Sequence, residues 1–126
     1  MDINVKKHQS IDDEIKDLSG AFFKNMVDKQ IEKSFKLYQI NRNEIILALM
    51  RANGRHFVYM LEKNDKVIYV GRSSNLYSRL ISHKSKKDFD NVKLIEYLDK
   101  NQMVDAEFFF IKYYNPVLNK MWVTYG

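Results

Sequence analysis

Residues 57–71 read FVYMLEKNDKVIYVG, and this stretch decides the fold of the 126-residue chain. Two runs rich in β-branched and aromatic residues, 57–62 and 66–71, flank Asn64-Asp65, which is typical of a β-hairpin. Both runs are apolar at consecutive positions, so we expect the hairpin to be central in its sheet and covered on both faces.

The length of the turn decides whether Tyr59 and Tyr69 share a face of this hairpin. A two-residue turn would pair Tyr59 with Val70 and send the two tyrosines to opposite faces. A three-residue loop at 63–65 would instead pair Tyr59 with Tyr69, and it would set Glu62 across from Lys66. We therefore expect the three-residue loop, with both tyrosines on a common face.

Elements on either side of the hairpin follow from apolar spacing. That spacing predicts helices over residues 10–36, 43–52, 75–84 and 103–114, and a third strand over 92–98. Pro116 ends the last helix, and the tail 117–125 is expected as a short strand or coil. The fold class is α+β: a small three-stranded, mainly antiparallel sheet flanked by helices. Residues 1–54 form a helical N-terminal extension, and 55–126 form the main domain.

Composition narrows the function classes. The chain has no cysteine, which excludes disulfides and thiolate metal sites, and His8, His56 and His83 are too scattered for a zinc cluster. No apolar run approaches the ~18 residues of a membrane span, and the N-terminus lacks the character of a signal peptide. We expect a cytoplasmic protein with no membrane partner.

Positive charge is concentrated in the second half of the chain. Residues 1–50 hold eight acids and eight bases, whereas residues 51–126 hold thirteen bases and eight acids. Residues 72–87 carry five bases and no acid. These bases are Arg72, Arg79, Lys84, Lys86 and Lys87. Such a patch attracts polyphosphate, although a solvated cationic face is an equal alternative.

The helix expected at 75–84 has a polar stripe that contains Asn75, Arg79, His83 and, just beyond it, Lys86. The apolar residues of this helix lie outside the polar stripe and are expected to face the core. They are Leu76, Tyr77, Leu80 and Ile81. Arg79 and His83 are four residues apart, so they stand side by side and can reach one phosphate. An ordinary amphipathic surface helix would show the same pattern.

Glu107 lies in the middle of an apolar stripe on the last helix. Its neighbours on that stripe are Met103, Val104, Phe110, Ile111 and Tyr114. A carboxylate there is costly unless it is paired or binds a cation. A functional site and a buried salt bridge, for instance to Arg79, are the two interpretations. For Tyr59 and Tyr69 taken singly, a buried phenol that only hydrogen-bonds its hydroxyl is the ordinary reading.

Taken in order, these residues resemble the GIY-YIG nuclease family over about residues 56–120. The matching segments are Val58-Tyr59, Tyr69-Val70-Gly71, Arg79, His83, Glu107 and Asn115-Pro116-Val117-Leu118-Asn119. In that family, a hairpin carries a tyrosine on each strand, the next helix carries Arg and often His, and a later helix carries a metal-binding Glu. One departure is Phe57, which stands where the first motif usually has Gly.

The resemblance implies a metal-dependent DNA endonuclease whose catalytic domain is 55–126. Glu107 would hold Mg²⁺ or Mn²⁺, and Arg79 would neutralise charge on the phosphate. Tyr59 would position or deprotonate the attacking water with help from His83, and Tyr69 would orient a phosphate oxygen. DNA would be bound by Arg72, Asn75, Lys84, Lys86, Lys87 and Asn119. No small-molecule cofactor beyond the metal is implied.

Two other functions fit the same sequence. One is a nucleic-acid-binding module that keeps the fold without catalysis. The other is a protein-interaction domain that uses the helical extension, with Glu107 in a structural ion pair.

Overall fold

The computed structural model describes residues 11–119, with side chains from Ala21 onward. Its hairpin consists of β2 (His56–Lys63) and β3 (Lys66–Ser73). The turn has two residues, Asn64 and Asp65, at φ 50° and 62°, and Lys63 pairs with Lys66. Asn and Asp tolerate this left-handed conformation, which two-residue hairpin turns require. The expected three-residue loop is therefore wrong.

A β-bulge nevertheless places the two tyrosines on one face. The register shifts between Leu61 and Glu62, so Leu61 lies opposite Tyr69 and Tyr59 lies opposite Gly71. The bulge inserts one residue, Ile68, into β3, and one extra residue reverses the phase of the side chains beyond it. The expectation of a common face is confirmed, because the rings of Tyr59 and Tyr69 have centroids 6.1 Å apart.

The sheet has four antiparallel strands in the order β1-β4-β2-β3. Strand β4 (Asn91–Tyr97) matches the expected third strand, whereas β1 (Lys36–Asn41) adds a strand that the sequence pattern did not indicate. The expected helix over 10–36 ends at Glu32 in helix α2 (Ile11–Glu32), because the amide of Phe35 already donates to the carbonyl of Glu96. The expected start at Ser10 lies outside the described residues. The α+β class with an antiparallel sheet is confirmed.

The helix expected at 43–52 is replaced by two 3₁₀ turns, Arg42–Glu44 and Leu47–Ala52. Ile46 lies between them in an extended conformation, at φ −123° and ψ 166°. The β-branched pair Ile45-Ile46 favours such a break, and Ile45 is thereby buried.

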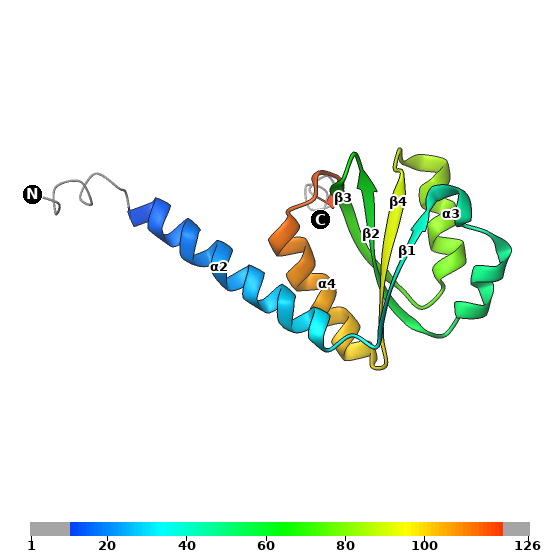
Figure 1. Ribbon diagram of the computed structural model, residues 1–126, viewed down its shortest axis with the longest axis horizontal. Coiled ribbons are helices and arrows are strands. Elements are labelled where there is room, and N and C mark those ends of the chain that lie inside the picture. Colours follow the sequence, from blue (N-terminus) through cyan, green and yellow to red (C-terminus); the bar gives the residue numbers. More distant parts are fainter. Residues whose placement is uncertain (1–10, 120–126) are drawn as a thin grey trace, which may run out of the picture.

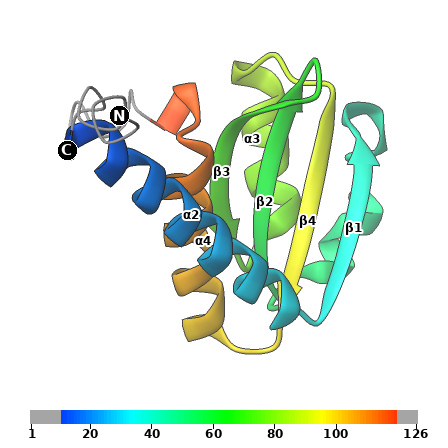
Figure 2. The same ribbon diagram turned by 60° about the vertical axis from the view of Figure 1, so that its left-hand side comes forward.

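Helices cover both faces of the sheet (Figures 1 and 2). On one face, α3 (Leu76–Lys86) and the 3₁₀ turns pack over an apolar cluster that includes Tyr59, Leu61 and Leu80. On the other, α4 (Lys100–Tyr114) contributes Met103 and Phe110 to an apolar cluster with Val58, Met60, Val70 and Ile95 of the sheet. Helix α2 packs against α4, and its N-terminal end projects away from the sheet (Figure 1). The hairpin is thus covered on both faces, as expected.

Beyond α4, the chain enters a left-handed residue, Asn115, and Pro116 before a helical turn at residues 117–119. That turn replaces the strand or coil expected there, and the remainder of the tail lies outside the described residues. None of the helices within 11–119 combines the length and the hydropathy needed to cross a bilayer. Strand β1 lies within residues 1–54 and pairs with β4 in the later part of the chain, so one sheet contains residues of both parts. The division into an extension at 1–54 and a domain at 55–126 stays a prediction.

Candidate active site

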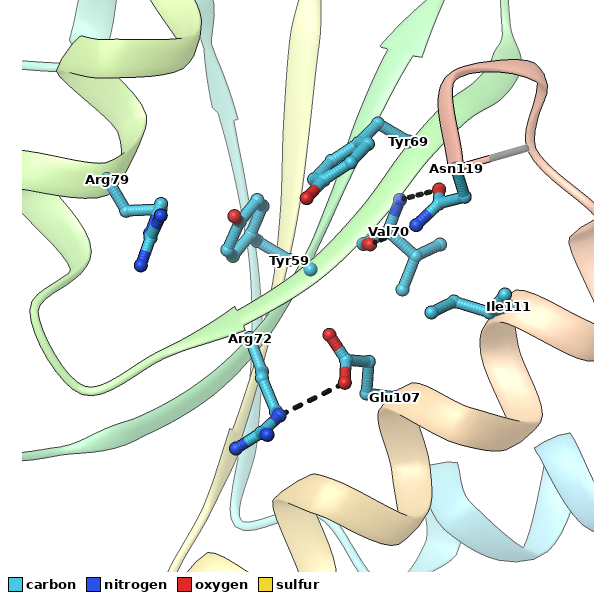
Figure 3. A pocket seen from close by; sticks show the side chains of 9 residues that line it. Tyr59, Tyr69, Val70, Arg72, Arg79, Glu107, Ile111 and Asn119 are labelled. Atoms are coloured by element: carbon cyan, nitrogen blue, oxygen red, sulfur yellow. Dashed lines mark hydrogen bonds and ion pairs between the residues drawn. The ribbon is translucent and has the colours of Figure 1, made fainter. Parts of the chain in front are cut away.

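A pocket of about 460 Å³ opens at the free edge of β3, between α3 and α4 (Figure 3). Because β3 is an edge strand, side chains from both faces of the sheet can meet around it. The lining brings together residues far apart in the sequence: Tyr59, Tyr69, Val70, Gly71, Arg72, Arg79, Glu107, Ile111 and Asn119. Four of the five expected catalytic residues line this pocket, and His83 does not.

Gly71 is what allows Tyr59 to reach the pocket. The Tyr59 ring lies so close over Gly71 that an added Cβ would be 2.4 Å from the phenol oxygen and 2.5 Å from Cζ. The φ of Gly71 is not left-handed, so its requirement is space and not backbone freedom. Gly71 was named in the motif, but its contact with Tyr59 was not foreseen. A glycine inside a run of strand-forming residues was the available signal.

His83, one turn from Arg79 on α3, lies behind Tyr59 and does not line the pocket. Its Nε2 is 2.8 Å from the Tyr59 hydroxyl, and only 7% of the residue is exposed. Burial, followed by the cations Lys87 and Arg79, lowers the pKa of His83 to about 4, so the imidazole is neutral at pH 7. Arg79 lines the pocket and His83 does not. That the two together reach one phosphate stays a prediction. His83 contacts the pocket through the hydroxyl of Tyr59.

Both phenols stay protonated at neutral pH. Burial is the main cause that raises the pKa of Tyr59 and of Tyr69, and the Glu107 carboxylate raises both further. Arg79 acts in the opposite direction on both. Each hydroxyl is therefore a donor as well as an acceptor inside the pocket.

Arg79 is exposed and extends from α3 toward the pocket (Figure 3). Within residues 21–119, no carboxylate forms an ion pair with it. A guanidinium without a carboxylate partner retains its planar set of donors for an anion such as phosphate.

Glu107 faces Arg79 from the opposite wall and is paired with Arg72. The Nε of Arg72 donates to Oε1 of Glu107 at 3.0 Å, and the Glu107 side chain is 23% exposed. The salt bridge considered for Glu107 thus exists, but its partner is Arg72 and not Arg79. Its second oxygen points into the pocket (Figure 3).

Burial raises the pKa of Glu107 above its ordinary value, and the adjacent Arg72 opposes that effect. The carboxyl therefore keeps its proton to a higher pH than a solvated glutamate does. A cation bound at Glu107 would favour the ionised form.

Asn119 is engaged by the backbone of β3. Its Oδ1 accepts from the amide of Val70, and its Nδ2 donates to the carbonyl of Val70, both at 2.8 Å. These two bonds satisfy the backbone amide and carbonyl of Val70 at the open edge of β3. Such unpaired groups on an edge strand can otherwise pair with another chain. Its carboxamide thus has a structural task, although nucleic-acid binding was expected.

The expected DNA-binding residues on and around α3 differ in their exposure to solvent. Asn75 and Lys86 are exposed, and the Asn75 side chain does not cap its helix. Lys84 is half-buried, and Arg42 donates to its carbonyl and to that of Lys87, which closes the C-terminal end of α3.

Lys87 covers the face of Tyr69, with its Nζ 5.0 Å from the ring centroid. Burial and the neighbouring Lys86 lower the pKa of Lys87. We did not foresee this stacking, because the sequence gives no signal of which aromatic ring a terminal lysine would meet. Lys87 helps to hold Tyr69 in addition to contributing charge.

Phe57, in place of the usual glycine, leaves the strand regular. It pairs with Ser73 on one side and Glu96 on the other, and its side chain is buried. The departure from the family motif therefore causes no local break in β2.

The donor set suits a hard divalent ion bound through oxygen. Among residues 21–119, no group of three or more His, Cys, Asp or Glu side chains could hold a metal. Glu107 offers one carboxylate oxygen in the pocket, beside the Tyr59 and Tyr69 hydroxyls (Figure 3). Mg²⁺ is commonly bound by one or two carboxylates together with water and substrate phosphates. The residues present thus fit an ion that binds together with its substrate.

Comparisons with known proteins identify the family of the chain. A family model for the GIY-YIG catalytic domain matches residues 55–120. Over 73 residues the chain is 40% identical to the UvrABC system protein C of Fusobacterium nucleatum subsp. nucleatum. That alignment covers 49% of this chain and 12% of the relative, so the chain spans only a small part of that relative's length. No solved structure gave a significant match. The chain belongs to the GIY-YIG nuclease family.

Proposed function

We propose that the protein is a metal-dependent DNA endonuclease that hydrolyses phosphodiester bonds in this pocket. One observation carries the proposal: Arg79 from α3 and Glu107 from α4 face each other across a pocket that also holds the hydroxyls of Tyr59 and Tyr69. An anion-binding group and a cation-binding group on opposite walls form a site for one phosphate and one metal ion.

Arg79 would hold the scissile phosphate. Its guanidinium can donate to two phosphate oxygens at once, and it has no carboxylate partner within residues 21–119 that would have to be displaced. Charge that grows on those oxygens in the transition state is stabilised by a donor that is already in place. Arg79 therefore acts on the rate more than on the affinity.

Glu107 would bind Mg²⁺ or Mn²⁺ through the oxygen that points into the pocket. When bound, such an ion supplies Lewis acidity at the phosphate and at the leaving oxygen. Arg72 keeps its hold on Oε1 and fixes the orientation of the carboxylate. A single carboxylate ligand gives weak metal affinity, so the substrate phosphate completes the site.

Tyr59 and His83 would handle the proton of the attacking water. The water donates its proton to the Tyr59 oxygen, the Tyr59 proton passes to Nε2 of His83, and the resulting hydroxide attacks phosphorus. The 2.8 Å contact between the two side chains and the neutral state of His83 support this route. Because the pKa of Tyr59 is raised, a concerted transfer avoids a separate phenolate. Tyr69 orients a phosphate oxygen beside it.

DNA would reach the pocket along the basic segment 72–87, which has no acidic residue. Exposed cations such as Lys86 attract the sugar-phosphate backbone without reading sequence.

The test is incubation of supercoiled plasmid with the purified chain in Mg²⁺, in Mn²⁺ and in EDTA. Conversion to nicked or linear DNA in both metals, and none in EDTA, is the expected result. Salt-dependent binding without cleavage in either metal would favour the inactive binding module. Failure to bind DNA at any salt concentration would favour the protein-interaction role.

A further inference from the structure

A second polar pocket lies beside the first on α3. It has a volume of about 300 Å³ and is lined by Ser73, Asn75, Ser78, Arg79 and Ser82. Arg79 lines both pockets, so the two are neighbours that share this residue. None of the features used in the proposed cleavage reaction requires this second pocket.

The lining consists of neutral hydrogen-bonding groups around one cation. Three serine hydroxyls and one carboxamide supply donors, and no carboxylate lines the pocket. The Ser73 hydroxyl accepts from the amide of Asn75, whereas none of the hydrogen bonds among residues 21–119 uses the hydroxyls of Ser78 and Ser82. Serine hydroxyls and asparagine amides are common partners of phosphate oxygens in protein–DNA complexes.

Serine and asparagine side chains extend along α3 over the length of several nucleotides. Asn75, Ser78 and Ser82 follow one face of the helix and extend over seven residues, which is about 10 Å at 1.5 Å per residue. A strand of duplex DNA advances about 3.4 Å per nucleotide. The 10 Å stretch therefore spans about three nucleotides, which is long enough to reach the nucleotide next to the one whose phosphate lies between Arg79 and Glu107.

We propose that this Ser73–Ser82 pocket is a second subsite, which binds the phosphate that flanks the scissile phosphate on the same strand. This inference rests on the proposed function. Arg79 stays on the scissile phosphate, and the neutral donors of this pocket hold the flanking one. The hydroxyls of Ser78 and Ser82 donate to the flanking phosphate and so set the position of the strand relative to Glu107.

Neutral donors give the subsite a measurable signature. A lysine that contacts a phosphate releases counterions, so its loss lowers the salt dependence of binding. A serine releases none, so its loss weakens binding equally at every salt concentration. The two kinds of contact are separated by plotting the logarithm of affinity against the logarithm of salt concentration.

The experiment uses the full chain in a Glu107→Gln background, so that bound DNA is not cut. Affinity for a fluorescein-labelled duplex is measured by anisotropy over a salt series for Ser78→Ala/Ser82→Ala, for Ser85→Ala and for Lys86→Ala. Ser85 is the matched control, because it is on the same helix but does not line the pocket. Alanine favours the helix more than serine does, so these variants should fold, and circular dichroism checks this.

We expect Ser78→Ala/Ser82→Ala to weaken binding roughly tenfold for two lost hydrogen bonds, with an unchanged salt slope. Lys86→Ala should lower the slope by about 0.9, and Ser85→Ala should match the background protein. Binding by Ser78→Ala/Ser82→Ala that equals that of Ser85→Ala would overturn the subsite and identify the pocket as a solvated polar face. A lower salt slope in Ser78→Ala/Ser82→Ala would also overturn it.

Plasmid cleavage by the chain with Glu107 intact, measured in parallel, separates this inference from the proposed function. Cleavage with no effect of Ser78→Ala/Ser82→Ala removes the subsite and leaves the nuclease. No cleavage, but binding that weakens in Ser78→Ala/Ser82→Ala, removes the nuclease and leaves a phosphate subsite. A chain that binds no DNA contradicts both.

Discussion

Replacing Gly71 by alanine should damage the site through a single steric contact. The new Cβ would be 2.4 Å from the Tyr59 oxygen, 2.5 Å from Cζ and 3.0 Å from Cε2, whereas ordinary contacts begin at 3.4 Å. The phenol must therefore move by about 1 Å, and a misplacement of that size in an active site can cost about 10²-fold in rate.

Tyr59 has little room for that movement. Its ring is almost fully buried, its hydroxyl is bonded to His83, and Tyr69 lies next to it. Overpacking of this kind typically costs about 1–3 kcal/mol of stability. We expect Gly71→Ala to lose stability within that range in urea unfolding and to cut supercoiled plasmid about a hundredfold more slowly.

A second substitution tests whether Tyr59 is the cause. In a Tyr59→Leu background the clashing ring atoms are absent, so Gly71→Ala should be neutral or slightly stabilising, as for an ordinary strand position. Gly54→Ala is the contrasting control. Gly54 has open space around it but φ +87°, so alanine there should cost about 1–2 kcal/mol through backbone strain and leave cleavage intact. A Gly71→Ala protein with normal stability and activity, or an equal cost in the Leu background, would refute the steric argument.

Three other substitutions give separate tests. Arg79→Ala should lower cleavage at saturating DNA by about 10²–10³ and change affinity little, whereas Lys86→Ala should do the reverse; unchanged turnover in Arg79→Ala would contradict its assigned role. His83 has a pKa of about 4 when folded and an ordinary value of 6.5, so its contribution to stability is complete above pH 6.5 and is lost as the pH falls toward 4. Wild type should therefore lose up to about 3 kcal/mol more than His83→Gln over that interval in urea unfolding, and equal losses would count against this burial effect. Asn119→Ala should cost about 1–2 kcal/mol and speed amide exchange at Val70, and unaltered exchange there would show that the two bonds do not protect the strand edge.

Local sequence patterns were enough to predict the helices and strands that position the site. The strands of the hairpin, α3, β4 and α4 all lie close to their expected limits, because each combines a clear apolar period with a cap or a turn. The apolar surroundings of Glu107 also follow from period alone, whereas the common face of Tyr59 and Tyr69 was expected from a loop that is not there and depends on the bulge instead.

Contacts between distant segments could not be obtained in this way. Strand β1 exists because it pairs with β4, with Lys36 opposite Glu96, sixty residues away. Its own six residues are half polar and none of them is fully buried, so they give no clear strand signal. The β-bulge shifts the hairpin register by one residue, and no residue type in the sequence predicts it. His83 is buried because Tyr59 reaches it from another strand, and Glu107 meets Arg72 because β3 is the edge strand. A helical wheel contains none of this information.

The most direct test of the central claim compares wild type with Glu107→Ala on supercoiled plasmid in Mg²⁺. Glu107 is partly exposed and its Arg72 partner can turn to solvent, so the loss of this ion pair should cost no more than about 1 kcal/mol. The account predicts cleavage by wild type and none by Glu107→Ala, with both proteins folded by circular dichroism and similar in urea midpoint. A Glu107→Ala protein that cuts at the wild-type rate would contradict the metal-binding role, and one that fails to fold would show that the Arg72–Glu107 pair is structural.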